Sequence, residues 1–221
     1  MTWFNCEIGQ GGGGTPKYIT AKKRLFAPSG IGTNAWRDDT DSVSMYINAG
    51  GYTPTEGEKV TVNSTNQLRM SFTIDNSYNV FGIRCKIDPN FTPANTDLWY
   101  NASCIMGTEL GGEQKDYAIV IDKNGYFALG WATANITSSS VYALDDEEHE
   151  LFMVAFDNAI KLYVDGVEEV SVDKVMGGNQ MTSMGVFWNN AGTATRTDGE
   201  IYAVGYWGYT APYIELPLPT L

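Results

Sequence analysis

Apolar and polar residues alternate along most of the chain from about residue 41 onward. In the stretches 43–48, 68–74 and 81–87, apolar residues occupy every second position. A period of two places these side chains on one face of an extended strand and their neighbours on the other. The pattern predicts half-buried β-strands, and its repetition predicts an all-β, antiparallel two-sheet sandwich or a barrel.

Turn residues separate the alternating stretches. Asn124-Gly125 lies between the apolar stretches 117–121 and 126–131. An Asn-Gly pair between two such stretches is a strong sign of a hairpin, because both residues tolerate the positive φ angles of a tight turn. We therefore expect these two stretches to pair as antiparallel strands.

A second turn is expected at Asp165-Gly166. Leu162 and Val164 share one face of the preceding strand, and Tyr163 points to the other face. Asp165-Gly166 can supply the positive φ angles of a two-residue type I′ turn before the chain re-enters the sheet.

Three stretches, in the order 102–131, 149–166 and 199–207, carry a wider pattern. The most specific piece is Leu-Tyr-Val-Asp-Gly at 162–166, after a strand and a tight turn. In their order and spacing, these stretches resemble the concanavalin A-like lectin/glucanase superfamily, in particular its laminin-G-like domains. The resemblance spans roughly residues 43–210 and implies a jelly-roll sandwich of two curved antiparallel sheets.

The predicted organisation has three parts. Residues 1–40 form a short N-terminal arm, residues 41–210 the concanavalin A-like sandwich, and residues 211–221 a C-terminal tail. The arm contains a glycine run at 9–14, which has little backbone preference and predicts a flexible joint. Both the arm and the tail depart from the superfamily pattern.

Composition and charge exclude several classes of protein. The 221 residues carry a formal charge of −12, which works against a general nucleic-acid binder. A single histidine excludes zinc sites built on several imidazoles, and three cysteines argue against a disulfide scaffold. We expect no signal peptide, transmembrane segment or membrane insertion, because no apolar run is long enough.

The charge is unevenly distributed. Residues 1–37 carry +4, whereas residues 38–221 carry −16. The arm can therefore lie against its own acidic domain or against a neighbouring copy. Alternatively, it is an attachment segment through which the chain docks on a larger assembly or self-associates.

The carboxylates do not form a hydrolase motif. Glucanases of this superfamily resemble one another in a Glu-x-Asp-x-Glu or Glu-x-Asp-x-x-Glu run on one strand face, and this chain has no such run. The acidic cluster 145–150 has consecutive charges, which do not share a strand face. His149 has no evident nucleophile partner. We therefore expect no catalytic residue and no enzyme.

Glycan binding is better supported by the residue types. Aromatic rings stack on the apolar faces of sugars, while amides and carboxylates bind hydroxyl groups. Most aromatic residues in so aromatic a chain must simply pack in the core, which is the alternative for each candidate. The candidates lie in or beside predicted loops or on an outward strand face: Trp99, Tyr100, Asn101, Tyr163, Trp188, Asn189 and Asn190.

Calcium is a candidate ligand of the acidic loops, although no cofactor is required. Ca²⁺ prefers hard oxygen ligands, which Asp145, Asp146 and Asp198 could offer. The alternative is that these residues only keep a loop solvated.

The preferred interpretation is a non-catalytic glycan-binding or adhesion module with a surface glycan as partner. The short strand-like start and glycine run also resemble small structural proteins of bacteriophages, which would place the chain in a phage tail, virion or cell surface. A purely structural protein-contact domain is the alternative, and a glycoside hydrolase ranks third.

Overall fold

The computed structural model describes residues 21–27, 35–38, 44–47, 60–62, 68–74, 78–98, 102–109, 117–131, 135–155, 159–173, 181–186, 197–209, 218–219 and 221. These residues contain fifteen strands and no helix. The strands are β1 Ala21–Ala27, β2 Ala35–Asp38, β3 Ser44–Ile47, β4 Val60–Val62, β5 Leu68–Ile74, β6 Tyr78–Ile87, β7 Ser103–Glu109, β8 Tyr117–Ile121, β9 Tyr126–Trp131, β10 Asn135–Tyr142, β11 Glu148–Ala155, β12 Ala159–Val164, β13 Val167–Asp173, β14 Met181–Val186 and β15 Gly199–Tyr209.

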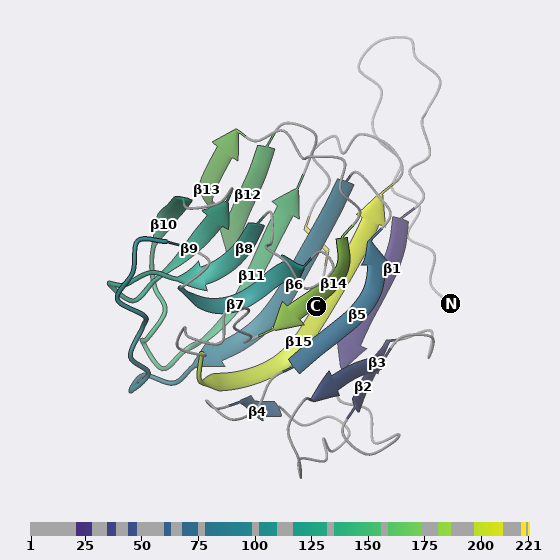
Figure 1. Ribbon diagram of the computed structural model, residues 1–221, viewed down its shortest axis with the longest axis horizontal. Helices are drawn as coiled ribbons and strands as arrows, with labels where there is room; N and C mark the ends of the chain where they lie inside the picture. Colours follow the sequence, from purple (N-terminus) through teal and green to yellow (C-terminus); the bar gives the residue numbers. More distant parts are fainter. Residues whose placement is uncertain are drawn as a thin grey trace.

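The strands form two antiparallel layers, as the alternation predicts. The first layer has the order β10-β9-β8-β7-β14-β5-β3, and the second has the order β15-β6-β11-β12-β13. β2 and β1 link the two layers into one hydrogen-bonded path, and β4 pairs with β15. The long strands β6 and β15 lie side by side in the second layer (Figure 1). The all-β sandwich expected from the sequence is confirmed.

The two ends of this path approach each other. β10 ends the first layer and β13 ends the second, and both lie at the same side of the molecule (Figure 1). The backbone N–H and the hydroxyl of Ser140 both donate to the Glu169 carboxylate, at 3.0 and 2.7 Å. A polar contact therefore joins the two layers at this edge.

The main core lies between the layers. It combines alternate side chains of β6, β11 and β12 with those of β8 and β9, and its largest fully buried members include Phe81, Tyr117 and Phe127. Leu162 and Val164 belong to this core, as their shared face predicts. Burial of each such aliphatic side chain stabilises the fold by roughly 1.5–3 kcal/mol.

The outer faces of both layers are also partly buried. Small side chains of β7, β8 and β9, among them Cys104, Ala118 and Val120, form a cluster on the outer face of the first layer. On the outer face of the second layer, four buried residues form what we call the outer cluster: Val80, Phe152, Val154 and Trp207. The sandwich therefore buries apolar side chains on both faces of its central strands.

Both predicted turns are present, with one difference. Asp165 and Gly166 have φ angles of 49° and 82° and connect the paired residues Val164 and Val167, as expected for a type I′ turn. The β8–β9 hairpin is confirmed, but its turn is longer. Gly125 N donates to Asp122 O at 3.0 Å, and Gly125 alone of this loop has a positive φ, 89°.

Part of the predicted N-terminal arm is strand. β1 pairs with β15 over six registered positions, and β2 pairs with β1 and β3. The glycine run at 9–14 lies outside the described residues. The division of the chain at residues 40 and 210 stays a prediction.

Gly82 of β6 is required by a close approach of the Phe152 ring. A Cβ at Gly82 would lie 2.5 and 2.9 Å from two carbons of that ring. The two residues are direct cross-strand partners of β6 and β11. The Phe152 ring therefore lies over Gly82, because any residue with a Cβ at that position would collide with the ring.

We expect Gly82→Ala to destabilise the fold. Alanine is ordinarily favoured over glycine inside a strand by about 0.5–1 kcal/mol. Crowding against the buried ring should reverse that sign and lower the free energy of unfolding by about 1–3 kcal/mol, as measured by urea denaturation. The double variant Gly82→Ala with Phe152→Leu should recover part of the loss, and a stabilising Gly82→Ala would contradict this packing.

Candidate functional site

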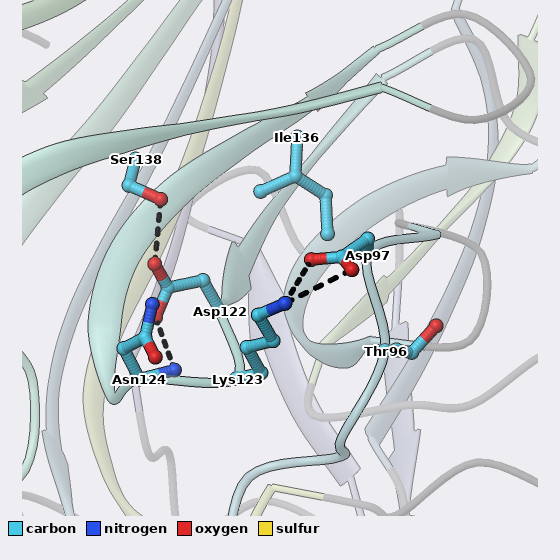
Figure 2. A pocket seen from close by; sticks show the side chains of 7 residues that line it. All are labelled: Thr96, Asp97, Asp122, Lys123, Asn124, Ile136 and Ser138. Atoms are coloured by element: carbon cyan, nitrogen blue, oxygen red, sulfur yellow. Dashed lines mark hydrogen bonds and ion pairs between the residues drawn. The ribbon is translucent and has the colours of Figure 1, made fainter.

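A pocket of about 140 Å³ opens where the β8–β9 turn meets β10 (Figure 2). Ile136 and Ser138 pair with Gly130 and Ala128 of β9, so they lie on the outer face of the first layer. Polar side chains dominate the pocket wall. The lining residues are Thr96, Asp97, Asp122, Lys123, Asn124, Ile136 and Ser138.

The buried carboxylate of Asp122 organises this pocket. It is 6% exposed, and its Oδ1 accepts the backbone N–H groups of Asn124 and Tyr126 at 2.8 and 3.0 Å. Ser138 Oγ donates to Oδ2 at 2.5 Å. Burial of a carboxylate is unfavourable unless hydrogen bonds replace those it made to water. The Asp122 side chain makes such bonds to the β8–β9 turn and to Ser138, so it also holds β10 against the turn.

Lys123 and Asp97 form the charged rim of the pocket. Lys123 Nζ lies 2.7 Å from Asp97 Oδ1 and 2.9 Å from Oδ2 (Figure 2). Because the Lys123 and Asp97 side chains are 39% and 80% exposed, the ion pair adds little stability. It does neutralise the lysine, so the pocket retains the net negative charge of the Asp122 carboxylate.

An exposed pair of tyrosines lies on the same strand face. Tyr126 and Tyr142 are cross-strand partners of β9 and β10, 37% and 43% exposed, with ring centroids 5.5 Å apart. Tyr126 is two residues from Ala128, the partner of Ser138, so strand alternation places the pair on the face that carries the pocket. Exposed rings beside polar groups can stack on a sugar.

His149 is held between two aspartates close to the start of β9. Its Nδ1 lies 2.7 Å from Asp165 Oδ2, and its Nε2 lies 3.1 Å from Asp145 Oδ2. The imidazole is buried and contacts the Phe127 ring edge-on. Glu150 N donates to Asp165 Oδ1 at 2.8 Å, which fixes that carboxylate. Both ring nitrogens can donate only when the imidazole is protonated.

This geometry raises the pKa of His149. Burial alone would lower the pKa, because it disfavours the charged ring. The hydrogen bonds and negative charges of Asp165 and Asp145 outweigh burial and raise the pKa above its ordinary 6.5. His149 therefore links the loop before β11 to the turn after β12.

Tyr163 is the one predicted glycan-binding residue that lies among the described residues. Tyr163 lies on β12, half-buried against the outer cluster, and its hydroxyl donates to Glu168 at 3.0 Å. It faces away from Leu162 and Val164 as expected, but on the second layer and far along the sheet order from the pocket. The other six lie outside the described residues: Trp99, Tyr100, Asn101, Trp188, Asn189 and Asn190.

The three proposed calcium ligands do not converge. Asp145 binds His149, and Asp146 pairs with Lys86 Nζ at 2.7 Å. Asp198 precedes β15, where its carbonyl accepts Asp88 N at 3.0 Å. Among the described residues, no three acidic, histidine or cysteine side chains gather as metal ligands. Calcium binding stays a prediction.

Cys85 and Cys104 are both buried. Cys85 faces the core, where burial, followed by the charges of Glu148 and Asp165, raises the pKa of its thiol. The thiolate is thereby disfavoured, and with it the nucleophilic form of the side chain. Cys104 lies instead in the cluster on the outer face of the first layer.

No pattern in the sequence connects the residues that line the pocket. Asp97 and Asp122 are far apart in the chain, and Asp122 is recognisable only as a turn residue before Gly125. Tyr126 and Tyr142 meet through the pairing of β9 with β10, which contains a register shift between Ser138 and Tyr142. Only the three-dimensional pairing brings these groups to one face.

The chain shares its fold with solved structures of other proteins. No family model and no curated protein matches the chain. Trypanosoma rangeli sialidase in complex with sialic acid is similar, with a TM-score of 0.65 and 14% identity over 83% of this chain. The chain spans only 30% of that sialidase.

A second similar structure is of comparable length. It is domain 4 of AbnA, an extracellular arabinanase from Geobacillus stearothermophilus, in complex with arabinotriose. The TM-score is 0.50 at 14% identity, and the match covers 79% of this chain and 88% of that domain. At such identities these similarities establish the fold.

These findings correct one expectation. The chain was expected not to be an enzyme, but the solved structures that share its fold are a sialidase and a domain of an arabinanase. The missing Glu-x-Asp-x-Glu motif excludes one arrangement of carboxylates on one strand and leaves other arrangements open. The comparisons support the sandwich and provide no support for the laminin-G or phage assignment. No helix of the described residues could span a membrane.

We expect the stability of the fold to fall as pH rises through the pKa of His149. A raised pKa in the folded state contributes stability fully below the unfolded value of about 6.5 and loses it at higher pH. His149 is the only histidine, so the variant His149→Gln should remove this dependence. The measurement is urea unfolding from about pH 5.5 to 9, a range that spans histidine titration. If the free energy of unfolding of the variant and of the unmodified protein changed equally with pH, the contacts of His149 with Asp145 and Asp165 would not be the cause of the dependence.

Proposed function

We propose that the chain is a glycan-binding module of a larger carbohydrate-active protein. The observation that carries the proposal is the polar pocket of the first layer beside the exposed Tyr126–Tyr142 pair. A sugar needs both elements: an aromatic surface for its C–H groups and polar atoms for its hydroxyls. The fold shared with an arabinanase domain in complex with arabinotriose supports the same function.

The pocket suits one sugar residue of a longer chain. Its volume of about 140 Å³ is well below the roughly 300–1,000 Å³ of pockets that enclose a drug-sized ligand. The hydroxyls of Thr96 and Ser138 and the amide of Asn124 offer the polar contacts. The tyrosine pair would carry the next residue of the glycan.

Electrostatics favour a neutral glycan. Lys123 is paired with both oxygens of Asp97, and the Asp122 carboxylate leaves the pocket negative. The whole chain has a charge of −12, so an anionic sugar would be repelled at the pocket and over most of the surface. Arabinose-type or other uncharged oligosaccharides are therefore the expected ligands.

The carrier of the module is a separate part of the proposal. The match to 30% of a sialidase and to one domain of an arabinanase supports attachment to further domains. The positive charge of residues 1–37 supports docking on an acidic neighbour. Membership of a virion or a cell-surface adhesin is a narrower form of the same proposal, in which many copies would raise a weak single-site affinity.

We expect alanine at the tyrosine pair to weaken glycan binding. Loss of one stacking ring, in Tyr126→Ala or Tyr142→Ala, should reduce affinity for arabino-oligosaccharides by roughly tenfold, as measured by calorimetry or on a glycan array. Asn124→Ala should act in the same direction. Ser171→Ala is the matched control, because Ser171 is exposed on β13 of the second layer.

The same samples separate the alternatives. Binding that survives these changes but is lost in Tyr163→Ala would move the site to the second layer and refute the pocket. Absence of binding to every glycan, even by a multimerised protein, would favour a structural domain. Release of sugar from arabinan, lost in Asp97→Asn, would show that the pocket acts on its glycan as well as binding it.

A further inference from the structure

The proton of the Ser138 hydroxyl has a fixed partner in the pocket. Ser138 Oγ donates it to Asp122 Oδ2 at 2.5 Å, and an ionised carboxylate can only accept (Figure 2). After donating its proton, a hydroxyl oxygen keeps two lone pairs that can accept. Ser138 is exposed on β10 and lines the pocket, so these lone pairs are open to a ligand. Toward a sugar, Ser138 is therefore an acceptor.

The Asp122 carboxylate is held in place independently of Ser138. Its Oδ1 accepts the backbone N–H groups of Asn124 and Tyr126 at 2.8 and 3.0 Å. Backbone N–H groups can only donate, so the carboxylate must stay where it is to pair them. Its other oxygen, Oδ2, is therefore presented to Ser138 whether or not a ligand is bound.

A hydrogen-bond donor comes from a different residue of the pocket. Lys123 Nζ has three N–H groups and lies 2.7 and 2.9 Å from the two oxygens of Asp97. This pairing leaves at least one N–H group for a sugar oxygen. Acceptance and donation are thus divided between Ser138 and Lys123, and the division is set by their aspartate partners.

We propose that Asp122 makes the pocket selective for a sugar whose bound hydroxyl is free, so that sugars O-acetylated or O-methylated at that position are excluded. This inference rests on the glycan-binding function proposed above. A free hydroxyl has a proton to donate to Ser138 Oγ, whereas an ester or ether oxygen only accepts and would face the lone pairs of Ser138 without a proton between them. Ser138 contacts the sugar, and Asp122 is a positioning residue that acts through Ser138.

The test replaces the sugar hydroxyls one at a time. Methyl arabinosides with fluorine in place of one hydroxyl stay close to the original size but have no proton to donate there. NMR titration compares each of them with methyl arabinoside, and the loss of affinity is called the fluorine ratio. At one position the unmodified protein should show a fluorine ratio of roughly three to ten, the range of one neutral hydrogen bond.

Asp122→Asn should abolish this discrimination. The amide oxygen must accept the N–H groups of Asn124 and Tyr126, so the amide nitrogen faces Ser138 and donates to it. The Ser138 proton is then released toward the pocket, where it no longer requires a donor on the sugar. The fluorine ratio should fall to about one. Ser138→Ala keeps the turn bonds of Asp122 and should also give a ratio of about one.

Asp97→Asn is the matched control. It removes one negative charge from the same pocket, as Asp122→Asn does, but Asp97 pairs with Lys123 and not with Ser138. It can change the affinity for every sugar alike, and it should leave the fluorine ratio at the Ser138 position as it is in the unmodified protein. A general loss of stability would likewise weaken binding of both sugars equally, so the ratio responds only to the hydrogen bond.

The outcomes separate this inference from the proposed function. Arabinoside binding with a fluorine ratio of about one at every position would refute the selectivity and leave glycan binding intact. Absence of binding to methyl arabinoside and to arabino-oligosaccharides would refute both. A ratio that persists in folded Asp122→Asn would show that another residue accepts the sugar proton. If Asp122→Asn does not fold, the same result in Ser138→Ala overturns the inference.

Discussion

Burial of the central strands on both faces is the constraint on which the rest of the structure depends. All five residues of β8 are buried, as are Leu151 to Ala155 of β11, although a strand of a two-layer antiparallel sandwich commonly shows one face to water. One face of each strand fills the core between the layers. The other face must be covered separately, and on the second layer Phe152 and Trp207 provide that cover.

Polar chemistry is confined to the ends and edges of these strands, where the apolar cover stops. Asp122 follows the last residue of β8, and its carboxylate accepts two backbone N–H groups of its own turn. Asp165 follows the last residue of β12, and its carboxylate accepts the N–H of Glu150 on β11. The polar side chains that these turns do not bury are exposed to solvent beside one another. The candidate glycan pocket and the contacts of His149 are both products of this arrangement: residues of the β8–β9 turn line the pocket, and His149 contacts Phe127 just after that turn.

The sequence predicts the strands well because their alternation is local. Leu162, Val164 and the turn at Asp165-Gly166 are where the period of two places them. The site could not be predicted, because Tyr126 meets Tyr142 only through strand pairing across an irregular register. Tyr163 was placed on the correct side of its strand, yet its neighbours on that side come from β6, β11 and β15, which no local pattern identifies.

The two buried cysteines offer a way to measure how often different parts of the sandwich open. Cys85 lies in the core between the layers and Cys104 in the cluster on the outer face of the first layer. Neither thiol can meet an alkylating reagent while its surroundings stay closed, so the rate of modification at each measures how often that region opens. Mass spectrometry of the two cysteine-containing peptides from one native sample would show whether the core and the outer face of the first layer open together or independently.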